Sequence, residues 1–94
     1  MSPVEASVAR HVVVWGRVQG VFFRSSCQER ARALGLAGWV RNTSTGSVEL
    51  WAEGDPARIA DLVRWCGDGP GHAVVERVEV DDVTPTGARG FHVR

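Results

Sequence analysis

The apolar and polar positions of this chain follow a strand-like period in some segments and a helical period in others. Residues 7–15 are dense in β-branched side chains, which is typical of a central strand buried on both faces. Residues 47–53 alternate between Val48, Leu50 and Ala52, expected inward, and the mainly polar set Glu49, Trp51 and Glu53, expected outward. This pattern predicts a strand with one face on the core. Three further segments are predicted as strands: 37–42, 74–83 and 90–94.

Two segments have the helical period. Residues 25–34 carry one apolar stripe, and Gly35 follows as a C-terminal stop. The stripe is formed by Cys27, Ala31 and Leu34. In the second segment Asp55 is expected to cap the helix and Pro56 to occupy its first position. Its apolar positions recur at i, i+3, i+4 and i+7: Ile59, Leu62, Val63 and Cys66.

The order of these elements is β-α-β-β-α-β with a short terminal strand. It predicts an α+β, ferredoxin-like fold (a split βαβ arrangement), in which two helices cover one face of an antiparallel sheet. With 94 residues, the chain is expected to form a single domain over 1–94. We expect an ordered core from about residue 7 to 94, preceded by a frayed lead-in over residues 1–6.

Charge and composition exclude several classes of function. Lys+Arg and Asp+Glu are 11 each, and this zero net charge argues against a nucleic-acid partner. No lysine occurs, so Schiff-base and P-loop lysine chemistry are excluded. No apolar run approaches the ~20 residues that span a bilayer, and the N-terminus has no apolar signal core. We therefore expect a cytoplasmic protein without a membrane partner.

The cysteines and histidines do not predict a metal site. Cys27 and Cys66 are too few for zinc, and the three histidines are scattered over different elements. No metal or cofactor is therefore expected. Both cysteines are interpreted as buried packing residues; the alternative is a disulfide, because antiparallel helices would bring them to the same end.

The strongest candidate site is the segment GRVQGVFFR, from Gly16 to Arg24. It joins the first strand to the first helix through a turn bounded by Gly16 and Gly20. Glycines at such a corner let backbone N–H groups converge, and a helix N-terminus adds unpaired N–H groups and partial positive charge. Arg24 adds a permanent cation with a planar fork of donors. These parts predict an oxyanion cradle, and phosphate is the expected anion.

Asn42 is the second candidate site residue, because it closes the second strand. If the first and second strands run parallel, their C-terminal ends meet at one sheet edge, and Asn42 faces the cradle near Arg24. Its amide oxygen can hold a water aimed at phosphorus, but it is no base. The alternatives are a turn-capping role for Asn42 and a solvated surface role for Arg24.

Such a site has a narrow chemistry. A cradle, an arginine and an amide supply positioning and charge stabilisation, but no nucleophile, base or leaving-group acid. The substrate must therefore already carry a good leaving group. An acyl phosphate does, since its carboxylate has a conjugate acid with a pKa of roughly 4–5. Phosphoryl transfer through a loose transition state then needs only charge on the equatorial oxygens.

Over nearly its whole length the chain resembles the acylphosphatase family. GRVQGVFFR is similar to the family's first signature, and GWVRNTSTGSVELWAEG, residues 38–54, is similar to the second. The resemblance implies an α/β sandwich that hydrolyses carboxyl–phosphate bonds of acyl phosphates, releasing inorganic phosphate, without metal or cofactor. It implies that Arg24 binds substrate and Asn42 orients water. The backbone of six residues would form the phosphate loop: Arg17, Val18, Gln19, Gly20, Val21 and Phe22. The family often has an aromatic residue after the last strand, where this chain has Arg94.

Weaker expectations concern the surroundings of the site. Gln19 is predicted to shape the loop with its side chain pointing outward. Arg17 is predicted to steer anions or to be an ordinary surface residue, and Trp15 to wall the acyl side of the pocket. The other three tryptophans are expected in the core or in helix–sheet packing: Trp39, Trp51 and Trp65. Two glutamates are expected to be solvated: Glu49 and Glu53.

Two other functions are weighed against hydrolysis. One is a non-catalytic anion-sensing or interaction module on the same fold, which would bind phosphate without turnover. The other is an RNA-binding ferredoxin-like module, which is disfavoured by the zero net charge and by the expected lack of a sheet aromatic pair. A monomer acting on a small-molecule acyl phosphate is expected.

Overall fold

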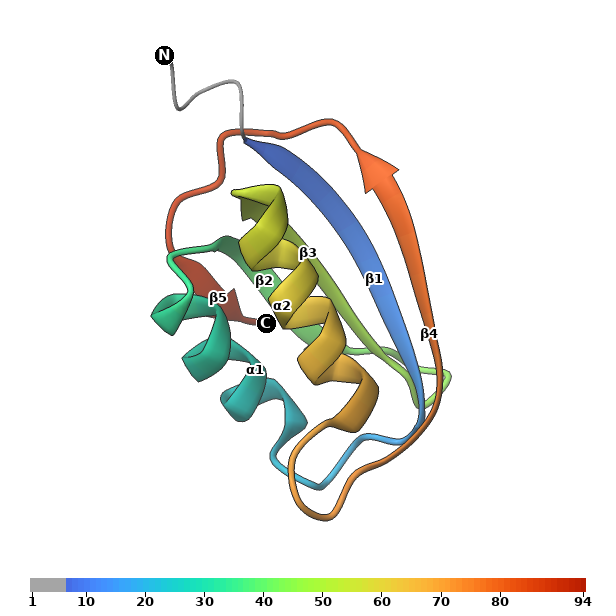
Figure 1. Cartoon of the computed structure of the whole chain (residues 1–94). Coiled ribbons are helices and arrows are strands. Elements are labelled where there is room, and N and C mark those ends of the chain that lie inside the picture. The colour runs from blue at the N-terminus through green and yellow to red at the C-terminus, as the bar shows by residue number, and fades with distance from the viewer. Residues whose placement is uncertain (1–6) are drawn as a thin grey trace.

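A computed structural model describes residues 7–94, so the lead-in expected over residues 1–6 lies outside the described residues. Figure 1 shows two helices packed on one face of a single sheet. The elements, in chain order, are β1 (Val8–Arg17), α1 (Phe23–Ala33), β2 (Ala37–Asn42), β3 (Val48–Gly54), α2 (Pro56–Asp68), β4 (Val74–Val83) and β5 (Phe91–Val93).

The sheet has the strand order β4-β1-β3-β2-β5. β3 is antiparallel to both β1 and β2, so β1 and β2 run parallel to each other, as the placement of the site requires. β5 joins the outer edge of β2 in parallel, which makes the sheet mixed rather than wholly antiparallel. The ferredoxin-like α+β fold predicted from the element order is confirmed.

The core lies between the sheet and the helices. The inward side chains of the strands meet the helix stripes, and these residues are all buried: Val12, Val14, Val40, Val48, Leu50, Cys27, Ala31, Ile59 and Leu62. The prediction that the first strand is buried on both faces is wrong, because both helices cover the same face and Val13, between the buried Val12 and Val14, is only half-buried. Burying such side chains contributes roughly 1.5–3 kcal/mol for each large aliphatic residue. The face of β2 that carries Val40 also carries Asn42, so the candidate site opens on the helix side of the sheet.

Helix α1 begins at Phe23, two residues earlier than the apolar stripe predicted. Phe23 is buried, and its ring lies 5.2 Å from the ring of Trp65 on α2. Trp65 therefore packs between the two helices. The start of α2 is as predicted, because the Asp55 side chain accepts a hydrogen bond from the Ala57 N–H at 2.8 Å and Pro56 is the first helical residue.

Gly16 is required where the chain leaves the sheet. Its φ is 131°, and a Cβ at this position would lie 2.1 Å from the carbonyl oxygen of Val74 on β4. The β1–β4 register also shifts between Trp15 and Gly16, so the strand bends there and the candidate loop begins.

Trp39 and Trp51 lie on the face of the sheet away from the helices, so their expected place in the core is wrong. They are register partners on β2 and β3, and the Arg94 guanidinium lies 4.5 Å from the centroid of the Trp39 ring. The pattern had already assigned Trp51 to the polar side of its strand. The expected lack of a sheet aromatic pair is therefore also wrong. The argument from zero net charge against a nucleic-acid partner is unaffected. On this face of the sheet the charge of Arg41 is also neutralised by its ion pair with Glu49.

Glu53 is buried, which overturns its expected solvation. The loop between β4 and β5 crosses this end of the sheet, and the carboxylate accepts five hydrogen bonds from Trp51 Nε1, Thr86 N, Thr86 Oγ1, Gly87 N and Ala88 N. Burial alone would raise the pKa of Glu53, but these donors outweigh it, led by the Thr86 hydroxyl, and lower the pKa to about 2. The carboxylate thus fastens the crossover that leads to β5.

β5 is held in place without an aromatic residue after it. Phe91 is buried, and its carbonyl accepts hydrogen bonds from Gln28 Nε2 at 3.1 Å and from Arg32 Nε at 3.2 Å, both on α1. The Arg94 N–H donates to the carbonyl of Val40 at 2.8 Å. The cation–π contact of Arg94 with Trp39 adds a side-chain contact between the end of β5 and β2.

Cys27 and Cys66 are free and buried. A hydrogen bond between the two thiols, together with burial, raises the pKa of Cys27 well above its ordinary value, so Cys27 packs as a neutral group between the helices. No helix in residues 7–94 is long and apolar enough to cross a membrane.

Candidate active site

The loop between β1 and α1 presents a run of free backbone donors. Within residues 7–94, none of the N–H groups of Val18 to Phe22 donates a hydrogen bond to another backbone or side-chain group. Gly20 has φ 73°, which turns the chain sharply inside this run. Successive unpaired N–H groups in a turning loop are typical of an anion-binding loop.

Helix α1 adds its N-terminus to the same loop. Its first turn has no side-chain cap and no acidic residue. Instead, Arg24 occupies the second helical position, exposed and without an ion pair in the described part of the chain. A cation at a helix N-terminus costs about 0.3–1 kcal/mol through the helix dipole. An anion bound at this point would reverse that cost and pair with the guanidinium.

Phe22, the residue before α1, has a strained backbone. Its φ of 62° and ψ of 24° place it in the left-handed region, and it is the one non-glycine residue with positive φ in residues 7–94. That conformation costs a non-glycine residue about 1–2 kcal/mol. It bends the loop into the helix, and its carbonyl accepts the Ser26 N–H at 3.0 Å.

A cavity of about 350 Å³ joins this loop to the end of β2. It is lined by Val18, Gly20, Phe22, Phe23, Arg24, Ser25, Asn42 and Val93. The structure thus brings Arg24 and Asn42 to one cavity. Of the six residues predicted for the phosphate loop, Val18, Gly20 and Phe22 line it directly, whereas Arg17, Gln19 and Val21 do not.

The Asn42 amide oxygen is buried without a hydrogen-bond partner among the described residues. Leaving such an acceptor unpaired costs about 1–3 kcal/mol, so we expect this oxygen to accept a hydrogen bond from a molecule in the cavity. A water molecule in the cavity would supply it. The alternative role in capping the following turn is not observed, because Thr43 makes those contacts.

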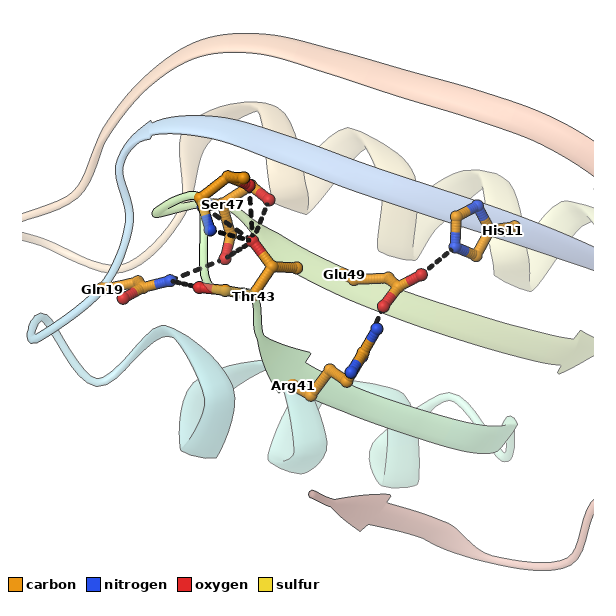
Figure 2. A network of polar contacts seen from close by, with 7 residues as sticks. His11, Gln19, Arg41, Thr43, Ser47 and Glu49 are labelled. Carbon is orange, nitrogen blue, oxygen red and sulfur yellow. Dashed lines mark hydrogen bonds and ion pairs between the residues drawn. The ribbon is translucent and has the colours of Figure 1, made fainter.

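The β2–β3 turn is closed by Thr43 and braced by Gln19 (Figure 2). The Thr43 hydroxyl lies 2.7 Å from Ser47 Oγ and 2.9 Å from Thr45 Oγ1. Gln19 Nε2 donates to the carbonyl oxygens of Thr43 and Ser47, both at 2.9 Å. The prediction that Gln19 points outward is therefore wrong. Its amide fastens the candidate phosphate loop to the turn that follows Asn42.

Trp15 does not wall the cavity. Its Nε1 donates to Glu79 at 2.9 Å and Arg77 lies 5.2 Å from its ring centroid, so it sits against β4 on the open face. Arg17 is exposed and outside the cavity, so anion steering by this residue stays a prediction.

Three lining residues were missed from sequence: Phe23, Ser25 and Val93. Val93 could not be placed from the sequence, because the parallel pairing of β5 with β2 that brings it beside Asn42 differs from the antiparallel sheet expected.

A second polar network lies on the open face and is separate from the cavity. Glu49 bridges His11 Nε2 and Arg41 Nε, each at 2.5 Å (Figure 2). Burial raises the pKa of Glu49, but the hydrogen bonds from His11 and Arg41 outweigh it and lower that pKa overall. Glu49 is therefore half-buried and paired, not solvated as expected.

The chemistry open to the cavity follows from its lining. It holds a cation, free N–H donors and an amide oxygen, but no His, Cys, Asp or Glu among the lining residues. The one hydroxyl, Ser25 Oγ, is 3.2 Å from the Phe22 carbonyl, to which it donates. Such a site can bind and orient a phosphoryl group and a water, but cannot supply a general acid.

Known proteins identify the family. The family model for acylphosphatase matches residues 10–93. An acylphosphatase of Rubrobacter xylanophilus is 57% identical over 84 residues, which covers 88% of this chain and 76% of that protein. A solved acylphosphatase from Coxiella burnetii is 39% identical with a TM-score of 0.96, covering 100% of this chain and 99% of that chain. The acylphosphatase structure from Bacillus subtilis is 33% identical with a TM-score of 0.90. The match covers 93% of this chain and 98% of that chain.

The chain therefore belongs to the acylphosphatase family, and it hydrolyses the carboxyl–phosphate bond of acyl phosphates to give a carboxylate and inorganic phosphate.

Proposed function

We propose that this hydrolysis takes place in the cavity between the β1–α1 loop and the end of β2, with Arg24 binding the phosphoryl group and Asn42 orienting the attacking water. The observation that carries the proposal is the buried amide oxygen of Asn42, which has no partner among residues 7–94 and shares its cavity with an arginine that is unpaired in the same range.

In the proposed complex, the phosphoryl oxygens accept hydrogen bonds from the backbone of the loop Arg17 to Phe22. The N–H groups of Val18 to Phe22 are free to donate, and those of the first turn of α1 lie next in the chain. The Arg24 guanidinium adds two parallel donors and a full positive charge. These groups stabilise the charge that spreads over the equatorial oxygens in the transition state.

The nucleophile in this proposal is a water that donates a hydrogen bond to Asn42 Oδ1. The amide orients one lone pair of that water toward phosphorus, which holds it for in-line attack. The P–O bond to the acyl group breaks as the water oxygen bonds to phosphorus. The carboxylate leaves without a proton because its conjugate acid has a pKa of about 4–5. The water's protons pass to the released phosphate and to solvent, so no protein base is needed.

The two roles can be separated by measuring turnover and product binding together. Hydrolysis of benzoyl phosphate in the presence of EDTA should fall by about 100-fold or more in both Arg24→Ala and Asn42→Ala. Inhibition by inorganic phosphate should be strongly weakened in Arg24→Ala but kept in Asn42→Ala, because of these two side chains only that of Arg24 contacts the phosphoryl group. Arg58→Ala is the matched control, since this exposed arginine lies on α2 outside the cavity.

Undiminished turnover in Asn42→Ala would contradict the role given to its amide oxygen. Phosphate binding without turnover in the wild type would instead favour an anion-sensing module on this fold.

We further propose that the enzyme works as a cytoplasmic monomer without nucleic acid or cofactor. The balanced charge supports the absence of a nucleic-acid partner. The two free, buried thiols fit the reducing conditions of the cytoplasm. Light scattering coupled to size-exclusion chromatography measures the oligomeric state, and turnover in EDTA tests the independence of metals.

A further inference from the structure

Neither the backbone conformation nor the burial of residue 22 accounts for a phenylalanine at this position. Its left-handed conformation favours glycine, and the loop already contains a glycine in that region at position 20. Its ring is 80% exposed, so the aromatic group gains little from the core. A costly residue that is not used for packing is typical of a position held by function.

The apolar surface beside the candidate site is concentrated on two residues. Four large apolar side chains are exposed in residues 7–94: Phe22, Val74, Val80 and Val93. Two of these four, Phe22 and Val93, line the cavity that holds Arg24 and Asn42. They come from the start of α1 and from β5, elements about 70 positions apart that the fold brings to one rim.

The position of the substrate decides what these two side chains can contact. If the phosphoryl end is bound by loop N–H groups and Arg24, the acyl end must occupy the remaining volume. Apart from the polar groups, that volume is bounded by Val18, Phe22, Phe23 and Val93. A cavity of about 350 Å³ falls at the small end of the ~300–1,000 Å³ range of ligand sites, so it has room for a compact acyl group.

We propose that Phe22, with Val93, is the specificity-determining residue for the acyl group. The pair selects acyl phosphates with an apolar aryl or alkyl group over those with a small acyl group such as acetyl. This inference rests on the proposed site. An aryl ring placed against Phe22 gains offset or edge-to-face contact and removes the exposed ring from water, whereas an acetyl group is too small to cover it.

The test compares two substrates on the full chain, benzoyl phosphate and acetyl phosphate, by the ratio of their kcat/KM values. Phe22→Asn keeps a residue that tolerates positive φ but removes the apolar ring. We expect the ratio to fall by about tenfold, the effect of removing a well-placed apolar contact from a specificity pocket. Phe22→Leu, which keeps apolar bulk, should restore part of the ratio. Val80→Asn, on an exposed valine outside the cavity, should leave the ratio unchanged.

An unchanged ratio in a folded Phe22→Asn variant, checked by circular dichroism, would overturn the inference, as would an equal loss on both substrates. Failure of the proposed site gives a different result: Arg24→Ala would then hydrolyse both substrates as well as the wild type. A lower benzoyl-to-acetyl ratio of kcat/KM in Val93→Asn would support the role of Val93 in selecting the acyl group.

Discussion

Replacing Glu53 by glutamine should destabilise the protein in a pH-dependent way. The substitution keeps the shape of the side chain but removes the charge that five donors surround. The pKa of Glu53 falls from an ordinary 4.5 to about 2. At 1.36 kcal/mol per pKa unit, that difference corresponds to about 3 kcal/mol of stability at pH 7.

The sign of the pH dependence follows from the direction of the shift. Because the folded pKa is the lower one, the unfolded chain binds the proton first as the pH falls. The stabilisation is thus fully present above pH 4.5 and is lost as the pH approaches 2. At pH 3, about 2 kcal/mol of it is already gone. We therefore expect Glu53→Gln to cost about 3 kcal/mol at pH 7 but only about 1 kcal/mol at pH 3.

Urea unfolding followed by tryptophan fluorescence at both pH values measures these differences. Glu76→Gln, on an exposed glutamate of β4, controls for the general loss of a negative charge and should change stability little at either pH. If Glu53→Gln cost the same at pH 3 and pH 7, the carboxylate charge would not be the source of the stability.

Two further predictions concern the surroundings of the site. Gln19→Ala removes two hydrogen bonds to the β2–β3 turn, so it should lower stability by about 2 kcal/mol and raise KM by loosening the loop. Urea unfolding and steady-state kinetics measure both effects, and an unchanged KM would show that the loop holds its shape without this brace. Cys27 and Cys66 should resist iodoacetamide in the folded protein and react once urea unfolds it, because both are buried and hydrogen bonding to Cys66 raises the pKa of Cys27. Rapid labelling of native protein, read by mass spectrometry, would contradict that packing.

The parts of the structure that the sequence predicted are those governed by local periodicity and strand direction. The meeting of Arg24 with Asn42 in one cavity follows from two parallel strands whose ends share an edge. Asp55 and Pro56 marked the start of α2 because capping chemistry is local to a few residues.

The errors have a different origin, since they depend on contacts between segments distant in sequence. Alternation placed Glu53 on the face away from the helices, but could not reveal the crossover loop that covers that end of the sheet. Gln19 points toward the β2–β3 turn for the same reason. A phenylalanine gives no sign in the sequence that its backbone is left-handed. The turn at Phe22 that starts α1 was therefore not predicted, and the helix was expected to begin later.

The position of β5 also bears on how the enzyme is made. The cavity takes residues from Val18 to Val93, so its wall is completed by a segment that is synthesised long after the loop. When the ribosome has added Asn42, the phosphate loop and the amide already exist in the nascent chain, but β4 and β5 do not. β1 then lacks its β4 neighbour and β2 lacks its β5 neighbour. The active site should therefore form only after translation of the β4–β5 region, in one late step of folding.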